Sequence, residues 1–170
     1  MDARSSKLTI TLPSDRAFVL TRTFDAPRDL VFRAWTMPEH VKRWYGCNIM
    51  TMLACDIDLR VGGAWRYVLR TPDGAKCTMQ GLYREIEPPA KLVYTEGYLA
   101  DGFTSPESLV TVLFNEHAGR TTLTSTVLHA TMQDRDGHLA SGVEHGANET
   151  FNRLDELLFE LTREARHGAS

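Results

Sequence analysis

Three ionisable side chains, Glu96, His145 and Glu149, are the strongest candidates for acid–base chemistry in this sequence. Glu96 lies in the apolar stretch 92–98, where it alternates in step with two tyrosines, so that all three would share one face of a β-strand. On a buried face, desolvation would raise the pKa of this carboxyl group toward the range that a general acid or base requires. A solvent-facing or salt-bridged Glu96 is the alternative.

His145 and Glu149 stand one helical turn apart, so that the two side chains would meet on one face of a helix. Facing a cavity, such a pair would shuttle protons; facing solvent, it would be an ordinary surface pair. Gly142 and Gly146 leave one side of the same helix bare. Because a glycine inside a helix costs about 1 kcal/mol, a steric reason is expected. Close packing of a neighbouring element is favoured over a cavity.

No motif for a metal ion, a cofactor or an activated nucleophile accompanies these residues. The other histidines fall in expected loops or near helix ends, without the spacing that would place two of them on one metal ion; they are His40, His117, His129, His138 and His167. Three cysteines without a CxxC pair are typical of unpaired thiols in a reducing compartment. We therefore predict no metal site and no cofactor, and whether the protein is an enzyme stays open.

Composition excludes several classes of partner. The net charge is −3, which gives no electrostatic reason to bind nucleic acid or an anionic membrane. The chain has neither an apolar run of signal-peptide length near its start nor one of about 18 residues, the length that a membrane helix needs. A cytoplasmic protein is expected. The 170 residues, of which 42% are hydrophobic, suit one domain at 16–166, after an extension at 1–15 that includes a short edge strand.

The elements that must position the candidate residues are mainly β-strands. Alternating patterns between turn-forming residues predict about seven strands, at 17–24, 55–60, 64–70, 76–87, 92–98, 108–115 and 120–129. Two short helices are expected between the first two strands. A long amphipathic helix is expected from about Leu139 to Arg166, with Thr131 and Asp134 resembling a cap ahead of it. This order predicts an α+β domain in which a curved antiparallel sheet wraps around the terminal helix.

Several segments, taken together and in order, carry a resemblance to a known family. They are 21–27 (TRTFDAP), 34–35 (AW), 38–44 (PEHVKRW), 62–67 (GGAWRY), 81–86 (GLYREI) and 153–158 (RLDELL). The chain resembles the family called activator of the heat-shock chaperone ATPase homologue, C-terminal-domain-like. That family belongs to the SRPBCC superfamily, which includes START domains, polyketide cyclases and the birch-pollen allergen. The resemblance covers nearly the whole chain from Ala17 onward and implies the helix-grip fold.

A helix-grip fold encloses a cavity between the concave face of its sheet and its terminal helix. Strand parity places Trp65, Tyr67 and the tyrosines beside Glu96 on the inward face. The expected ligand-binding residues are Trp44, Trp65, Tyr67, Met79, Tyr94, Glu96, Phe114 and His145.

The favoured function is binding of a small, mostly apolar molecule in this cavity. Two alternatives stay open. A cyclase or hydrolase would use Glu96, or His145 with Glu149, as acid and base. A chaperone-associated stress-response protein would instead need an exposed patch for its partner. A homodimer formed through an exposed strand edge is a further alternative that stays open.

Overall fold

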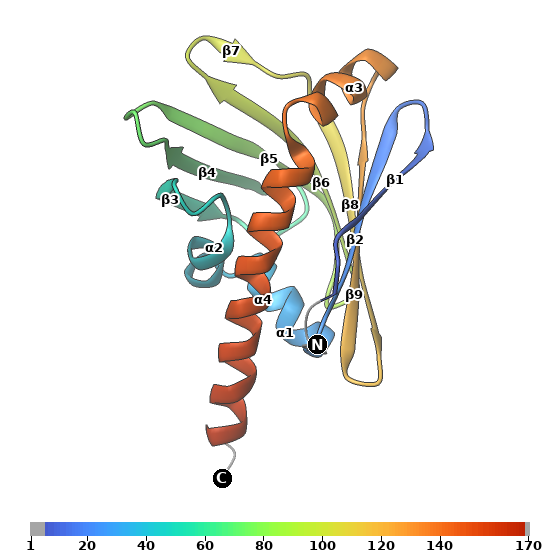
Figure 1. Ribbon diagram of the computed structural model, residues 1–170, viewed down its shortest axis with the longest axis vertical. Helices are drawn as coiled ribbons and strands as arrows, with labels where there is room; N and C mark the ends of the chain where they lie inside the picture. Colours follow the sequence, from blue (N-terminus) through green and yellow to red (C-terminus); the bar gives the residue numbers. More distant parts are fainter. Residues whose placement is uncertain (1–5, 169–170) are drawn as a thin grey trace.

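The structure of the protein is a computed structural model, and residues 6–168 are described (Figure 1). The first five residues of the expected N-terminal extension lie outside this range. Within it the strands are β1 (Thr9–Ser14), β2 (Ala17–Phe24), β3 (Thr51–Ile57), β4 (Ala64–Arg70), β5 (Lys76–Glu87), β6 (Lys91–Ala100), β7 (Phe103–Thr104), β8 (Ser108–His117) and β9 (Arg120–Leu128). The helices are α1 (Arg28–Thr36), α2 (Pro38–Trp44), α3 (Met132–Ala140) and α4 (Val143–Gly168).

The strands form one antiparallel sheet in the order β1-β2-β9-β8-β6-β5-β4-β3, with β7 paired to β6. The sheet curves, and α4 runs along its concave side with α1 and α2 beside it (Figure 1). Helix α4 packs against the other three helices. The expected α+β helix-grip architecture, with its terminal helix and its two short helices between the first long strands, is confirmed.

Two details of the sheet differ from the prediction. The described residues contain nine strands instead of about seven: β1 lies where the short edge strand of the extension was expected, and the two-residue β7, which was not expected, adds a short hairpin to β6. Strand β3 covers Thr51–Ile57 instead of 55–60. It ends there because the chain turns back at once: the Asp58 amide donates to Ala64, and the Gly63 amide donates to Arg60.

The terminal helix is interrupted where a continuous one was expected. The Thr131 hydroxyl accepts from the Asp134 amide and caps α3, as the sequence suggested. Helix α3 then ends at Ala140, because Gly142 takes a φ of +98°, a backbone conformation that glycine adopts far more readily than other residues. Helix α4 begins at Val143 in a new direction. Gly142 therefore serves to break the helix and does not mark close packing, since a Cβ there would meet no atom within 4 Å.

One buried charge links the sheet to α4. Arg22 occupies an inward position of β2 between buried Leu20 and Phe24, and it is only 3% exposed. Its Nη1 donates to Asn152 Oδ1 at 2.7 Å, and its Nη2 lies 3.9 Å from Asp155 Oδ2. Burial lowers the pKa of Arg22, and the charge of Asp155 opposes this. These contacts connect α4 to β2.

We predict that Asn152→Ala lowers the free energy of unfolding by about 1.5 kcal/mol, because a hydrogen bond to a buried charged group is lost. Asn148→Ala, one turn earlier, is the matched control. Its side chain donates only to the exposed Glu144 carbonyl of its own helix, so a change within about 0.5 kcal/mol is expected. Urea denaturation followed by circular dichroism measures both. Equal effects would show that the Arg22 contact does not hold α4.

Candidate functional site

A cavity of about 290 Å³ lies between the concave face of the sheet and the helices. This volume is close to the lower end of the range for small-molecule sites, roughly 300 to 1,000 Å³. Strands β2, β4, β5, β6, β8 and β9 and all four helices contribute to its wall. The lining residues are Phe18, Leu20, Trp35, Trp44, Tyr45, Gly46, Cys47, Met50, Leu69, Cys77, Met79, Tyr94, Glu96, Tyr98, Val110, Ser125, Val127, His138, Val143, Gly146, Ala147, Thr150 and Phe151.

Helix α4 contributes to the cavity through one narrow stripe. Val143, Gly146, Ala147 and Thr150 follow one another at steps of three, one and three residues, which places them on a single helix face. A Cβ built at Gly146 would meet no atom within 4 Å, so close packing, the expected reason for this glycine, is wrong. The bare face opens onto the cavity, which was the second explanation.

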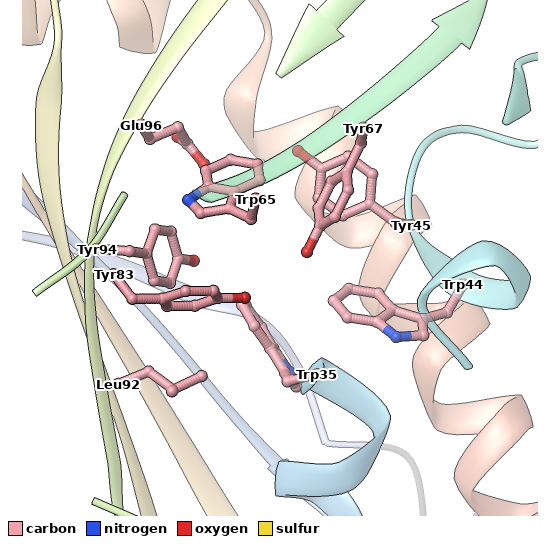
Figure 2. A pocket seen from close by; sticks show the side chains of 9 residues that line it. All are labelled: Trp35, Trp44, Tyr45, Trp65, Tyr67, Tyr83, Leu92, Tyr94 and Glu96. Atoms are coloured by element: carbon pink, nitrogen blue, oxygen red, sulfur yellow. The ribbon is translucent and has the colours of Figure 1, made fainter. Parts of the chain in front are cut away.

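A second, small cavity of about 20 Å³ adjoins the large one (Figure 2). Its volume is about what a single water molecule requires. It is lined by Trp35, Trp44, Tyr45, Trp65, Tyr67, Tyr83, Leu92, Tyr94 and Glu96. Trp35, Trp44, Tyr45, Tyr94 and Glu96 line both cavities, so the two share a wall.

The seven aromatic rings of the small cavity form a continuous chain. Neighbouring ring centroids lie 4.7 to 6.2 Å apart, in the order Trp35, Trp44, Tyr45, Tyr67, Trp65, Tyr94 and Tyr83. These are the distances at which aromatic side chains stabilise one another by edge-to-face or tilted contacts. Rings from β4, β5 and β6 thus meet rings from α1, α2 and the residue that follows α2 (Figure 2).

Trp65 is held in place by a close approach of β5 to β6 at Gly81. Its Nε1 donates to the Thr95 carbonyl of β6 at 3.2 Å, although β5 lies between β4 and β6 in the sheet order. The indole reaches across because the intervening residue is Gly81, where a Cβ would stand 1.7 Å from Thr95 O. The register of β5 and β6 shifts just beyond this point. Only glycine allows this close approach, and the hydrogen bond holds Trp65 in its tilted contact with Tyr67 and its edge-on contact with Tyr94.

The corner between α1 and α2 positions the opposite wall. Trp44 Nε1 donates to the Ala34 carbonyl at 2.8 Å, and Trp44 is buried. The chain continues directly into Tyr45, whose ring meets Tyr67 edge-on at 4.7 Å. Pro38 at the start of α2 sets this corner, since its missing N–H is not needed in the first turn of a helix.

Glu96 is the charged residue of the site. Its side chain lines both cavities and is partly buried. No residue in the described range 6–168 donates a hydrogen bond to its carboxylate or forms an ion pair with it, and neither cavity lining contains a lysine or an arginine. Burial raises the pKa of Glu96 to about 7. A carboxyl group of this kind can hold or release a proton near neutral pH, or accept a hydrogen bond or a positive charge from a ligand.

The other titratable groups of the linings stay neutral around pH 7. Burial raises the pKa of each tyrosine that lines either cavity, Tyr45, Tyr67, Tyr83, Tyr94 and Tyr98, and the charge of Glu96 raises the pKa of Tyr45 and Tyr94 further. Burial also raises the pKa of the Cys47 and Cys77 thiols. His138 contacts His129 (Nδ1 to Nε2, 2.9 Å), and burial together with His129 lowers its pKa to about 4.

The structure places most of the predicted lining residues at a cavity. Trp44, Met79, Tyr94 and Glu96 line the large cavity, and Trp65 and Tyr67 line the small one. Phe114 lines neither of them: it lies four residues beyond Val110 on β8, where α1 covers the sheet, and it packs on Phe32 and Trp35.

His145 is also outside the site. Its side chain is 88% exposed, because position 145 falls off the cavity-facing stripe of α4. The expected pairing with Glu149 exists, Nε2 to Oε2 at 3.7 Å, but on the solvent side. Glu149 instead accepts from the Asn48 amide at 2.6 Å and fastens the loop after α2 to α4. The pair therefore lies at the surface, which was the alternative to a pair facing the cavity.

Sequence reasoning missed several lining residues from irregular or distant segments. Tyr45 and Cys47 follow α2, and His138 comes from α3. The adjacency of Tyr45 to Trp44 was the one available signal, whereas His138 lies on α3, a separate helix that the sequence did not distinguish from the terminal one. In the range 6–168, no three His, Cys, Asp or Glu side chains are grouped so that they would hold a metal ion. No helix in that range combines the length and apolar character needed to span a membrane.

Comparisons with solved structures agree with this architecture. A protein from Rhodobacter sphaeroides is 29% identical, with a TM-score of 0.83 over 90% of this chain and 98% of that chain. Proteins from Nitrosomonas europaea and Mycobacterium smegmatis are 26% and 25% identical, each with a TM-score of 0.79 over 89% of this chain, and 99% and 97% of their own chains are covered. A comparison with curated proteins found no match.

A protein-family model also matches this chain. The model described as "Activator of Hsp90 ATPase homolog 1-like protein" matches residues 25–159, which extend from the residue after β2 into α4 and include nearly all of the cavity wall. The resemblance seen in the sequence motifs is thereby confirmed. The chain belongs to the family of Activator of Hsp90 ATPase homolog 1-like proteins.

Proposed function

We propose that this protein binds a small, mostly apolar molecule in the cavity between its sheet and α4. The observation that carries the proposal is the 290 Å³ cavity with a largely apolar wall. Burial of apolar ligand surface supplies the driving force, at about 25 cal/mol per Å² removed from water. Few polar groups line the wall, and these would orient the ligand.

The experiment fills the cavity from a position that tolerates a side chain. Gly146→Leu places an isobutyl group at the cavity face of α4, where a Cβ meets no atom within 4 Å. Binding of N-phenyl-1-naphthylamine, an apolar dye that fluoresces in dry sites, is expected for the native protein. The affinity for the dye should fall at least about tenfold in the variant, because the leucine side chain occupies volume that the dye needs.

Gly137→Leu is the matched control. Gly137 also lies inside a helix with open space around it, but on the exposed side of α3 and outside both cavity linings. Both substitutions should raise helix stability, because leucine is a better helix former than glycine by about 0.8 kcal/mol. The dye should bind Gly137→Leu like the native protein. Equal dye binding by the native protein and Gly146→Leu would contradict the proposal.

Acid–base catalysis is a second candidate function, favoured by Glu96. A carboxyl group with a pKa of about 7 inside a cavity is suited to move a proton at neutral pH. The test incubates small-molecule extracts with native protein and with Glu96→Gln, and compares them by mass spectrometry. A metabolite consumed only by the native protein supports catalysis. Unchanged extracts in both cases favour binding alone.

A chaperone-associated role is a proposal of lower rank. The family's name refers to an ATPase activator, but the observation that carries our proposal is an internal cavity and not a contact surface. Co-elution of the purified chain with a chaperone ATPase, retained in Gly146→Leu, would support that role separately from the cavity.

A further inference from the structure

The charge distribution around the cavity narrows the kind of ligand that it would accept. Of the residues that line the two cavities, Glu96 is the one acidic residue, and lysine and arginine are absent from both linings. An anionic ligand would therefore have no positive partner and would face a carboxyl group. A neutral ligand would leave the ionised carboxylate without a positive partner, which is costly in a site removed from water.

The carboxyl group also sits among aromatic rings. Glu96 lines the small cavity together with three tryptophans and four tyrosines, whose rings form the chain described above (Figure 2). Aromatic faces carry negative electrostatic potential and attract cations placed within about 6 Å of the ring centre. A positive group beside this carboxylate would gain both an ion pair with Glu96 and cation–π contacts with the rings.

Size favours a compact cation beside Glu96. The small cavity holds about 20 Å³, about what one water molecule requires, and an ammonium group matches that volume better than a trimethylammonium head does. The large cavity begins at the same five shared residues and continues toward Val127, Ala147 and Val110, where the wall is apolar. A ligand that spans both would have a small polar head and an apolar body.

We propose that the cavity binds an amphiphilic primary amine, with its ammonium group at Glu96 among the aromatic rings and its apolar body along α4. This inference rests on the proposed binding function and adds the chemical class of the ligand. The pairing would supply the positive partner that the Glu96 carboxylate lacks within residues 6–168.

The inference predicts a pH dependence with a defined sign. An amine needs the ionised carboxylate, so its affinity should rise as the pH increases through the pKa of Glu96, about 7. The groups that face Glu96 from the other elements do not change charge between pH 5.5 and 8. His138 of α3 has a pKa lowered to about 4, and the thiols and phenols have raised pKa values; they are Cys47, Cys77, Tyr45, Tyr67, Tyr83, Tyr94 and Tyr98.

Three probes that share one apolar body test the inference. They are 4-phenylbutan-1-amine, 4-phenylbutan-1-ol and 4-phenylbutanoate, titrated calorimetrically into the protein at pH 8 and pH 5.5. At pH 8 the amine should bind at least about tenfold more tightly than the alcohol, because its pairing with a carboxylate is charge-assisted. At pH 5.5 most of this preference should vanish. The butanoate should bind most weakly at pH 8.

Glu96→Gln separates the inference from the function on which it rests. The variant should lose the preference for the amine at pH 8, so that the amine and the alcohol bind to it with similar affinities. If the alcohol binds and the amine shows no advantage at pH 8, or if the butanoate binds best, the amine inference is overturned and the binding function stands. If none of the three probes binds, the proposed function itself fails.

Discussion

Glu96→Gln is expected to make the protein more stable at pH 8, raising its melting temperature by roughly 5 to 10 °C. In the folded state the pKa of Glu96 is about 7, against an ordinary value of 4.5. The folded state therefore keeps a proton that the unfolded chain releases as the pH rises from 4.5 to 7, and stability falls over that window. Above pH 7 the loss is complete, on the order of 2 to 3 kcal/mol, which corresponds to the stated shift for a chain of this length.

The gain from glutamine should shrink as the pH falls, and should be close to zero near pH 4.5, where both states hold the proton. His138 acts in the opposite sense, because its lowered pKa of about 4 makes stability rise with pH between about 4 and 6.5. Comparing variant and native protein at each pH cancels this contribution. Glu107→Gln, at an exposed site outside both linings, is the control and should change little. A variant less stable than the native protein at pH 8 would mean that the carboxylate is paired.

Gly81→Ala is expected to lower the free energy of unfolding by about 3 kcal/mol, at the upper end for overpacking. The added Cβ would stand 1.7 Å from Thr95 O and 2.8 Å from Trp65 Nε1, and the nearer of these atoms belongs to backbone. Relief requires β5 and β6 to separate and Trp65 to give up its hydrogen bond to Thr95. The indole would then leave the aromatic chain, and tryptophan fluorescence should change with the loss of stability.

Gly97→Ala on the neighbouring strand is the matched control. A Cβ there meets only Gln80 O, at 4.0 Å, an ordinary contact. Because glycine inside a strand is destabilising by roughly 0.5 to 1 kcal/mol relative to alanine, this substitution should be neutral or slightly stabilising. Guanidinium denaturation followed by fluorescence measures both variants. Similar small effects at positions 81 and 97 would show that the close approach at Gly81 is not needed for the fold.

The fold was predictable because its signals are local. The bounds of β2, β4 and β5 follow from strict alternation between turn residues, and parity alone placed Trp65 and Tyr67 on the inward face. The cap at Thr131 was readable for the same reason. These features are set by residues that are close together in the sequence, so one sequence is enough to predict them.

The two residues that were wrongly expected at the cavity, Phe114 and His145, are placed by contacts between elements that are distant in the sequence. Phe114 has the correct parity, but α1 covers β8 at that level, and no pattern within β8 records where a helix crosses it. His145 and the cavity-facing Gly146 are adjacent, and only the rotation of α4, set by the break at Gly142, decides which of them faces inward. The pKa of Glu96 likewise arises from burial by elements distant in sequence.

The most direct test of the binding cavity is the position of a bound probe in the protein. With 4-phenylbutan-1-ol and protein labelled at the methyl groups of Ala, Met and Val, nuclear Overhauser effects should connect the phenyl ring to Met79, Val127 and Ala147, which line the cavity. The exposed methyl groups of Val61 should show none. Effects confined to exposed methyl groups, or none at saturating probe, would contradict binding between the sheet and α4.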